Sequence, residues 1–340
     1  MIKRPLWRFC GIGVLVLVLV GWAGTATAAK WANPGLLVTP ETVKQNAAKS
    51  DWVIVDCRNL RDYAKGHIPG AISLGKRCKK ALRDSTARVF RNTSKYEKLL
   101  GKVGIGNDTH VVFYHGNIKT LTDATVGFWV LEYLGHDKVY VLNGGLEAWR
   151  KAGNRLDNKP VRKKATTFKV NVVSSRYSPT DEILNIARGA AKGTQLVDSR
   201  TKKEFLGKDM RAMRGGHIPN ATLNRSHLDT LLKKKDPKTG KMVPTGYLDP
   251  DAATKAFGSL DRSKRTIGYC QTGTRSTMTY LQFRLLGFKD PANWDESWRV
   301  YGSQPSYPAA NEQWYNFGGV NKKIKKLEKK IKKLETSLKK

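Results

Sequence analysis

Cys270 is the residue whose type and position could do chemistry. It follows the apolar run 266–269 and precedes a helical pattern that begins at Ser276. At such a junction, backbone N–H groups and the positive end of the helix dipole favour thiolate over thiol. The loop at the junction consists of Gln271, Thr272, Gly273, Thr274 and Arg275. Gly273 allows the loop to curl and Arg275 adds a fixed positive charge, so the segment predicts a nucleophilic cysteine that binds an anion.

The chain repeats itself, and this loop lies in the second copy. The matching pairs of segments are 52–58 with 195–200, 66–71 with 216–221, and 111–115 with 266–270. In each copy, short β-branched runs alternate with helical stretches, two of which should end near Gly135 and Gly287. Strands that alternate with helices imply a parallel sheet covered by helices on both faces. We therefore expect an α/β fold of two similar domains.

Other residues of the repeat should support the site. Asp198 ends a predicted strand and Arg200 follows two residues later, and the first copy has the same pair at 56–58. Such a pair can fix the loops at the carboxyl ends of the strands, where ligands collect in parallel sheets. The first copy has His115 where the second has Cys270. Because histidine cannot form a persulfide, we expect the first copy to be inactive.

Together these features resemble a tandem rhodanese-type sulfurtransferase over residues 35–305. The resemblance also rests on the segments 142–149 and 294–298. It implies two rhodanese-like domains: an inactive one at 35–152 and a catalytic one at 180–305, joined by a linker at 153–179.

The resemblance also implies a reaction. The Cys270 thiolate would take the outer sulfur of a small anionic donor such as thiosulfate and become a persulfide, and cyanide or a thiol would then accept that sulfur. The loop amides from Gln271 to Arg275 would cradle the sulfur, and Arg275 would steady the anionic donor. The resemblance implies no metal and no organic cofactor.

The chain also departs from the family pattern. Gln271 and Thr272 stand where familiar thiosulfate enzymes carry basic residues, and Glu204 stands where an arginine often reaches the donor. Lys202, Lys203 or Arg211 could substitute for that arginine. Mercaptopyruvate enzymes typically show Cys-Gly-Ser-Gly-Val-Thr, which this loop lacks, so thiosulfate is favoured over mercaptopyruvate.

Two other functions stay open. Cysteine phosphatases of the same fold have five residues between Cys and Arg, whereas four separate Cys270 from Arg275 here, so a phosphatase is disfavoured. A persulfide carrier or sulfur-handling module with little turnover of small donors would keep Cys270, and the weak charge of the loop favours this alternative.

Composition limits the partners. The chain has 340 residues, a formal net charge of +34 and four cysteines. Its basic residues are spread along the chain without a nucleic-acid motif, so we expect no nucleic-acid partner and a preference for small anions and acidic partners. No cluster has metal-ligand spacing. Cys57 is expected to be a packed thiol, with a Cys57–Cys78 bridge left open.

The N-terminal residues 1–29 have the pattern of a signal peptide. Lys3, Arg4 and Arg8 precede an uncharged run, and Ala26-Thr27-Ala28 offers a cleavage site. The sequence therefore predicts a periplasmic or otherwise exported protein. An uncleaved membrane anchor is the alternative, although the apolar run is short for it.

The C-terminal residues 321–340 form a Lys-rich heptad pattern. Apolar residues recur at spacings of 3, 4, 3 and 4, namely Ile324, Leu327, Ile331, Leu334 and Leu338. This seam predicts a short amphipathic helix that forms a homo-oligomeric coiled coil through 322–338. There are two alternatives. The segment could be a basic amphipathic helix that contacts an anionic membrane surface, or it could be a frayed tail.

Overall fold

The computed structural model describes Met1 and residues 29–338 of the chain. The predicted signal peptide and its alternative, a membrane anchor, therefore lie almost entirely outside the described residues. Within the described part, no helix has both the length and the apolar character needed to cross a membrane.

The first domain is built on a five-stranded parallel sheet in the order β1-β5-β4-β2-β3. Alternate residues of β2 face opposite sides, so Val53 and Val55 pack with α4 and α5 while Ile54 packs with α1 and α6. Burial on both faces explains why the strand is a continuous apolar run. The elements are β1 (Leu37–Val38), α1 (Pro40–Asn46), β2 (Trp52–Asp56), α2 (Leu60–Lys65), β3 (Ile72–Ser73), α3 (Cys78–Ala81), α4 (Ser94–Lys102), β4 (His110–Tyr114), α5 (Leu121–Tyr133), β5 (Val139–Leu142) and α6 (Gly145–Lys151).

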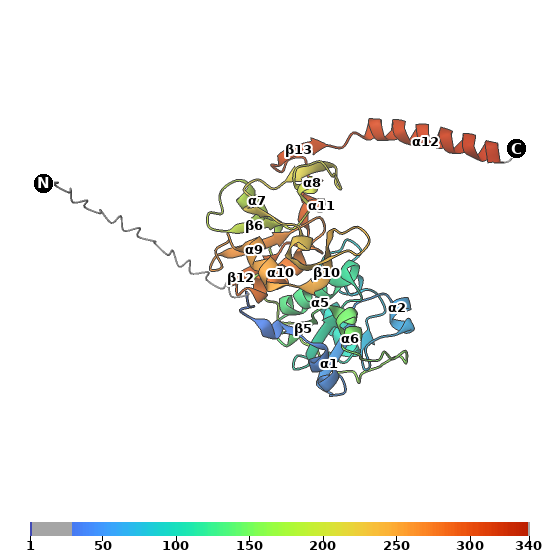
Figure 1. The fold of residues 1–340 in the computed structure, drawn as a ribbon, viewed down its shortest axis with the longest axis vertical. Helices are drawn as coiled ribbons and strands as arrows, with labels where there is room; N and C mark the ends of the chain where they lie inside the picture. The colour runs from blue at the N-terminus through green and yellow to red at the C-terminus, as the bar shows by residue number, and fades with distance from the viewer. Residues whose placement is uncertain (2–28, 339–340) are drawn as a thin grey trace.

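The second domain repeats this plan with a four-stranded parallel sheet in the order β12-β11-β6-β8. Ile267 packs with α7 and α11, and Val197 packs with α9 and α10 on the other face. The expected α/β fold with helices on both faces of each sheet is thus confirmed (Figure 1). The elements are α7 (Thr180–Ala187), β6 (Gln195–Asp198), α8 (Lys202–Phe205), β8 (Leu223–Asn224), α9 (Pro250–Phe257), β11 (Arg265–Tyr269), α10 (Ser276–Leu285), β12 (Asp290–Asn293) and α11 (Ser297–Tyr301).

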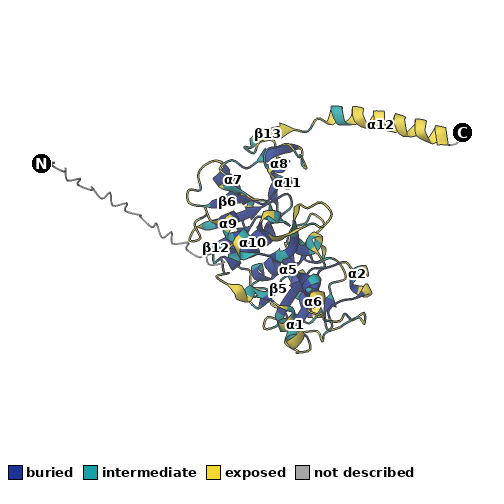
Figure 2. Ribbon diagram, viewed as in Figure 1, coloured by how far each residue is buried: buried dark blue, intermediate teal, exposed yellow. Residues whose placement is uncertain are grey.

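Two antiparallel pairs and a long helix complete the second half. One pair joins β9 (Leu231–Lys235) to β10 (Met242–Leu248), and the other joins β7 (Arg214–His217) to β13 (Ala310–Trp314). The helix α12 (Phe317–Leu338) extends away from the two domains and is exposed along most of its length (Figures 1 and 2). The predicted C-terminal helix is therefore present, and it begins four residues earlier than expected.

The two domains share one core where α5 packs against α10. Apolar side chains of both helices belong to a single buried cluster. Polar contacts add to it: the hydroxyl oxygens of Thr125 and Thr277 lie 2.8 Å apart, and Arg284 donates two hydrogen bonds, of 3.0 and 2.9 Å, to the same carboxylate oxygen of Glu132. These contacts fix the orientation of the domains, and they place the segment before α10, which holds Cys270, beside the first domain.

Cys57 and Cys78 form a disulfide, and both are buried. The expectation that Cys57 is an unpaired packed thiol is therefore wrong. The sheet explains the pairing, because β3 runs beside β2 and returns the chain to the start of α3. This arrangement brings the two Cα atoms to 4.8 Å, within the usual range for a disulfide.

Removal of this disulfide should destabilise the protein. The bond joins residues 21 positions apart. Loss of a disulfide that closes a loop of that size should lower the free energy of unfolding by about 3 kcal/mol. Denaturant unfolding of the Cys57→Ala/Cys78→Ala variant measures this loss, with reduced wild-type protein as the matched control. The reduced protein should resemble the variant, and an oxidised protein no more stable than either would contradict the prediction.

Candidate active site

The carboxyl ends of two neighbouring strands bring the predicted site residues together. β6 and β11 pair in parallel with Asp198 opposite Tyr269, so Cys270 emerges beside Asp198. Arg200 donates to the Asp198 carboxylate at 2.6 Å and to the Gly216 carbonyl at 2.8 Å. This buried pair connects the end of β6 to β7, so it fixes the strand ends beside which the Cys270 loop emerges.

Ser297, at the start of α11, holds the loop after β11 through hydrogen bonds. The Ser297 hydroxyl accepts hydrogen bonds from the N–H groups of Cys270 at 3.1 Å and Gly273 at 3.0 Å, and it donates to the Trp294 carbonyl at 2.7 Å. One side chain therefore sets the curvature of the loop between Cys270 and Gly273.

Gly273 is required at its position for two reasons. Its φ of +65° lies in the left-handed region that favours glycine. A Cβ atom at this position would also lie 2.5 Å from the backbone oxygen of Asp295. The predicted role of Gly273 in letting the loop curl matches this geometry.

The Cys270 thiol is fully buried inside the loop. Burial raises its pKa, but the Arg275 guanidinium, the N–H groups of Thr272 and Ser276, and the Ser276 hydroxyl together outweigh burial, so the pKa lies below its ordinary value. The buried Ser276 hydroxyl has no hydrogen-bond partner among the described residues, which leaves it available to a charged sulfur. A buried thiol with a lowered pKa and surrounding donors is poised to act as a thiolate.

Arg275 is paired with a carboxylate that is itself fully buried. Its two terminal nitrogens donate to Glu204 at 2.8 and 2.7 Å. Burial raises the pKa of Glu204, but the Arg275 guanidinium and the Thr201 N–H and hydroxyl groups bring it down to about 2. Arg211, one of the expected substitutes for a donor-binding arginine, approaches Glu204 at 3.8 Å, and its carbonyl accepts from Gln271 at 2.7 Å. Arg275 thus carries the fixed positive charge that the sequence predicts, and a buried carboxylate is paired with it.

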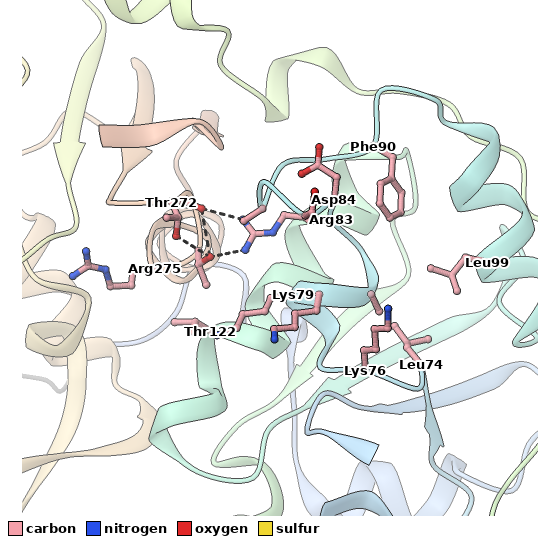
Figure 3. A pocket seen from close by; sticks show the side chains of 15 residues that line it. Leu74, Lys76, Lys79, Arg83, Asp84, Phe90, Leu99, Thr122, Thr272 and Arg275 are labelled. Atoms are coloured by element: carbon pink, nitrogen blue, oxygen red, sulfur yellow. Dashed lines mark hydrogen bonds between the residues drawn. The ribbon is translucent and has the colours of Figure 1, made fainter. Parts of the chain in front are cut away.

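The loop is also held by the first domain. Arg83 donates to the Thr272 carbonyl at 3.2 Å and to the Thr274 hydroxyl (Figure 3). It also donates to the Asp295 carboxylate at 2.8 Å. Its side chain is only 1% exposed. The loop is therefore held by hydrogen bonds from both domains, with Ser297 of the second domain and with Arg83 of the first.

Comparison with known proteins places this geometry in a family. The model of the rhodanese-like domain matches the chain twice, at residues 39–152 and 183–304. The chain belongs to the rhodanese-like sulfurtransferase family. A protein of Saccharopolyspora erythraea named "putative thiosulfate sulfurtransferase" is 32% identical over 284 residues, which cover 82% of this chain and 97% of that one. A Mycobacterium tuberculosis protein of the same name is 32% identical over 295 residues, covering 82% and 98%.

Solved structures share the fold at lower identity. An anaerobic ergothioneine biosynthesis enzyme from Chlorobium limicola, in complex with trimethyl histidine, superposes with a TM-score of 0.67 and 22% identity over 82% of this chain and 71% of that chain. This likeness supports the two-domain rhodanese-like architecture.

The first rhodanese-like domain keeps the scaffold and has a buried histidine at the position of Cys270. Its Asp56–Arg58 pair repeats the geometry of the second domain, with a guanidinium-to-carboxylate distance of 2.6 Å. His115 corresponds to Cys270 in the repeat and is fully buried, with Nδ1 3.1 Å from the Asn117 carbonyl oxygen. Burial lowers the pKa of His115 to about 4, so the ring is neutral at physiological pH. Gly246 of β10 lies against this ring.

Sequence reasoning missed Arg83 and Ser297. Arg83 lies in the basic stretch that follows the repeated segment 66–71, and that cluster of charge was the only signal for it. Ser297 lies within the 294–298 segment that resembles the closing motif of the family. Within 29–338, no group of three or more His, Cys, Asp or Glu residues could hold a metal ion.

The Glu204–Arg275 pair should restrain the acidity of Cys270. In Glu204→Gln the Arg275 charge is no longer compensated, so the pKa of Cys270 should fall further and its alkylation by iodoacetamide should begin at lower pH. The pH dependence of the alkylation rate measures the shift. Asp209→Asn is the matched control, because it removes a more exposed carboxylate that pairs with Arg211 nearby. An unchanged or raised midpoint in Glu204→Gln would contradict the prediction.

Proposed function

We propose that this rhodanese-like protein moves a sulfane sulfur from thiosulfate, or a similar small anionic donor, through a Cys270 persulfide to cyanide or a thiol. One observation carries the proposal: Cys270 is a buried thiol of lowered pKa inside a six-residue loop, 270–275, at a strand-to-helix junction. The curated relatives named for thiosulfate sulfurtransfer support thiosulfate as the donor.

The reaction has two displacements. The Cys270 thiolate attacks the outer sulfur of thiosulfate, the sulfur–sulfur bond of the donor breaks, and sulfite leaves with the electron pair. The acceptor then attacks the outer sulfur of the persulfide, and the electron pair of that bond returns to Cys270. The loop N–H groups and the Ser276 hydroxyl stabilise the anionic sulfur in both states. The persulfide is covalent, so the proposed reaction uses no metal and no organic cofactor.

A persulfide carrier is the second candidate. The observation that favours it is the pairing of Arg275 with Glu204, because this pairing weakens the attraction of the loop for a dianion such as thiosulfate. In that case Cys270 still holds a sulfur but turns over small donors slowly. Mercaptopyruvate transfer and phosphate ester hydrolysis are less favoured, since the loop lacks the sequence typical of the first and the length typical of the second.

Export from the cytoplasm fits this function. Residues 1–29 have the pattern of a signal peptide, and the Cys57–Cys78 disulfide is of the kind that persists in oxidising compartments. Both observations support a periplasmic or otherwise exported protein.

The exposed seam of α12 supports self-association as a parallel coiled coil. Its apolar residues are 47–88% exposed, namely Ile324, Leu327, Ile331, Leu334 and Leu338. Ile at the first two a positions and Leu at the d positions favour a coiled coil of two parallel helices. In that register Lys323 and Lys330 occupy g positions, and Glu328 and Glu335 occupy the e positions they would face on a second copy.

Loss of the nucleophile should abolish sulfur transfer. Cys270→Ser is expected to reduce thiocyanate formation from thiosulfate and cyanide by at least about 1,000-fold, because a hydroxyl cannot carry the persulfide. Thiocyanate is measured colorimetrically, and the denaturant midpoint of the variant shows that the fold persists. Full activity in the variant would overturn the mechanism. Slow turnover by a wild-type protein that still loads sulfur would favour the carrier.

Disruption of the seam should make the protein monomeric. Leu327→Lys/Leu334→Lys places charges at both d positions and should abolish concentration-dependent dimerisation of the full chain in sedimentation equilibrium. Lys326→Gln/Lys333→Gln, which changes the outer c positions, is the matched control and should still dimerise. A wild-type protein that stays monomeric and binds vesicles of anionic lipid would instead favour the membrane-surface alternative.

A further inference from the structure

A cavity of 930 Å³ lies between the two domains and adjoins the Cys270 loop. The loop contributes Thr272, Thr274 and Arg275 to its lining, and the first domain contributes all of the rest. Its volume falls within the range of about 300–1,000 Å³ that is typical of small-molecule sites. A single tetrahedral ion such as thiosulfate would leave most of this space empty.

The lining is strongly cationic. Its charged residues are Lys76, Lys79, Lys80, Arg83, Arg275 and the single acid Asp84. Three of these cations already have carboxylate partners, since Arg83 binds Asp295, Arg275 binds Glu204, and Lys79 lies 3.7 Å from Asp123. Lys76 and Lys80 make no ion pair with any residue that the structure describes, and both are exposed. These two ammonium groups are therefore the charges left for a bound anion.

One wall of the cavity is apolar. Leu74, Phe90 and Leu99 lie on the side away from Thr272 and Arg275, with Lys79 between the two groups (Figure 3). The Arg275 side chain extends away from this wall, toward its partner Glu204. A ligand that fills the cavity therefore needs a carbon skeleton as well as negative charge.

The segment that carries the lysines is anchored before a ligand arrives. Cys78, the first residue of α3, is bonded to Cys57 at the end of β2. Arg77, just before α3, donates to the Asp123 carboxylate of α5 at 3.1 Å. Burial lowers the pKa of Lys79, and the nearby Arg77, Arg83 and Lys80 lower it further against the opposing effect of Asp123, which indicates an excess of positive charge.

We infer that this cavity binds a low-molecular-weight thiol with two carboxylates, which accepts the sulfur from Cys270. The carboxylates pair with Lys76 and Lys80, the carbon skeleton contacts the apolar wall, and the thiolate points toward the loop. The inference rests on the proposed function and names the acceptor class for it. The first domain, which has no nucleophile of its own, thus selects the acceptor.

The transfer step balances without a further reactant. The acceptor thiolate forms a bond to the outer sulfur of the Cys270 persulfide. The sulfur–sulfur bond of the persulfide breaks, and its electron pair remains on Cys270 as a thiolate. One thiolate and one persulfide anion are consumed, and one of each is produced.

A graded series of acceptors tests the inference. The full-length protein is loaded with thiosulfate and desalted, and the rate of persulfide loss is followed by mass spectrometry with mercaptosuccinate, 3-mercaptopropionate or 2-mercaptoethanol, which carry two, one and no carboxylates. Lys76→Gln/Lys80→Gln should slow transfer to mercaptosuccinate by about 2- to 30-fold at subsaturating concentration and leave 2-mercaptoethanol unchanged. Lys65→Gln/Lys192→Gln removes the same charge from exposed positions outside the cavity and should change neither rate.

The outcomes separate the two proposals. In one outcome the protein loads sulfur while Lys76→Gln/Lys80→Gln changes the transfer rates to mercaptosuccinate and to 2-mercaptoethanol equally. That result would overturn the inference about the cavity and leave the proposed function standing. A protein that never loads sulfur would overturn the proposed function. In that case calorimetry with 2-(methylthio)succinate, which cannot accept sulfur, still tests the cavity. The inference is supported if the wild-type protein binds this compound, the Lys76→Gln/Lys80→Gln variant binds it more weakly and the Lys65→Gln/Lys192→Gln control binds it equally well. Absence of binding to the wild-type protein overturns the inference.

Discussion

The contact of Arg83 with the Cys270 loop is the constraint on which the rest of the site depends. A nearly buried guanidinium from the first domain meets two oxygens of the loop and the Asp295 carboxylate of the second domain. Burial raises the pKa of Asp295 to about 6 even though Arg83 and the Val89 N–H favour its charged form. Each of these buried charges therefore needs the other. The first domain carries His115 at the position of Cys270, and without that domain the loop would lose its contacts with Arg83 and the cavity would lose most of its wall.

Buried acids in this strongly basic chain are paired one by one with arginines. Asp56, Asp198, Asp295 and Glu204 are all fully buried, and each lies within 3 Å of a guanidinium nitrogen. The first three pairs hold loops at the ends of strands or between domains. The fourth holds the Arg275 guanidinium beside the thiol and compensates part of its charge. The lowered pKa of Cys270 comes from the Arg275 guanidinium and from hydrogen-bond donors of Thr272 and Ser276.

Local patterns made most of the fold and the centre of the site predictable. The strand runs, the Asp-x-Arg pairs and the Cys270 loop each depend on a few neighbouring residues, so the duplication and the strand-to-helix position of Cys270 were visible in the sequence. Contacts between distant segments were not visible. Arg83 lies 189 residues from Thr272 in the chain, and Glu204 lies 71 residues from Arg275. The Cys57–Cys78 bond depends on how β3 returns the chain to β2, which spacing alone does not reveal.

Intact-mass spectrometry tests the central claim most directly. Folded, reduced protein is weighed before and after incubation with thiosulfate, and again after addition of cyanide or a thiol. We expect a gain of one sulfur, ~32 Da, which peptide mapping places on Cys270 and which the acceptor then removes. A gain on another residue, or no gain from protein shown to be folded with Cys270 reduced, would contradict the account.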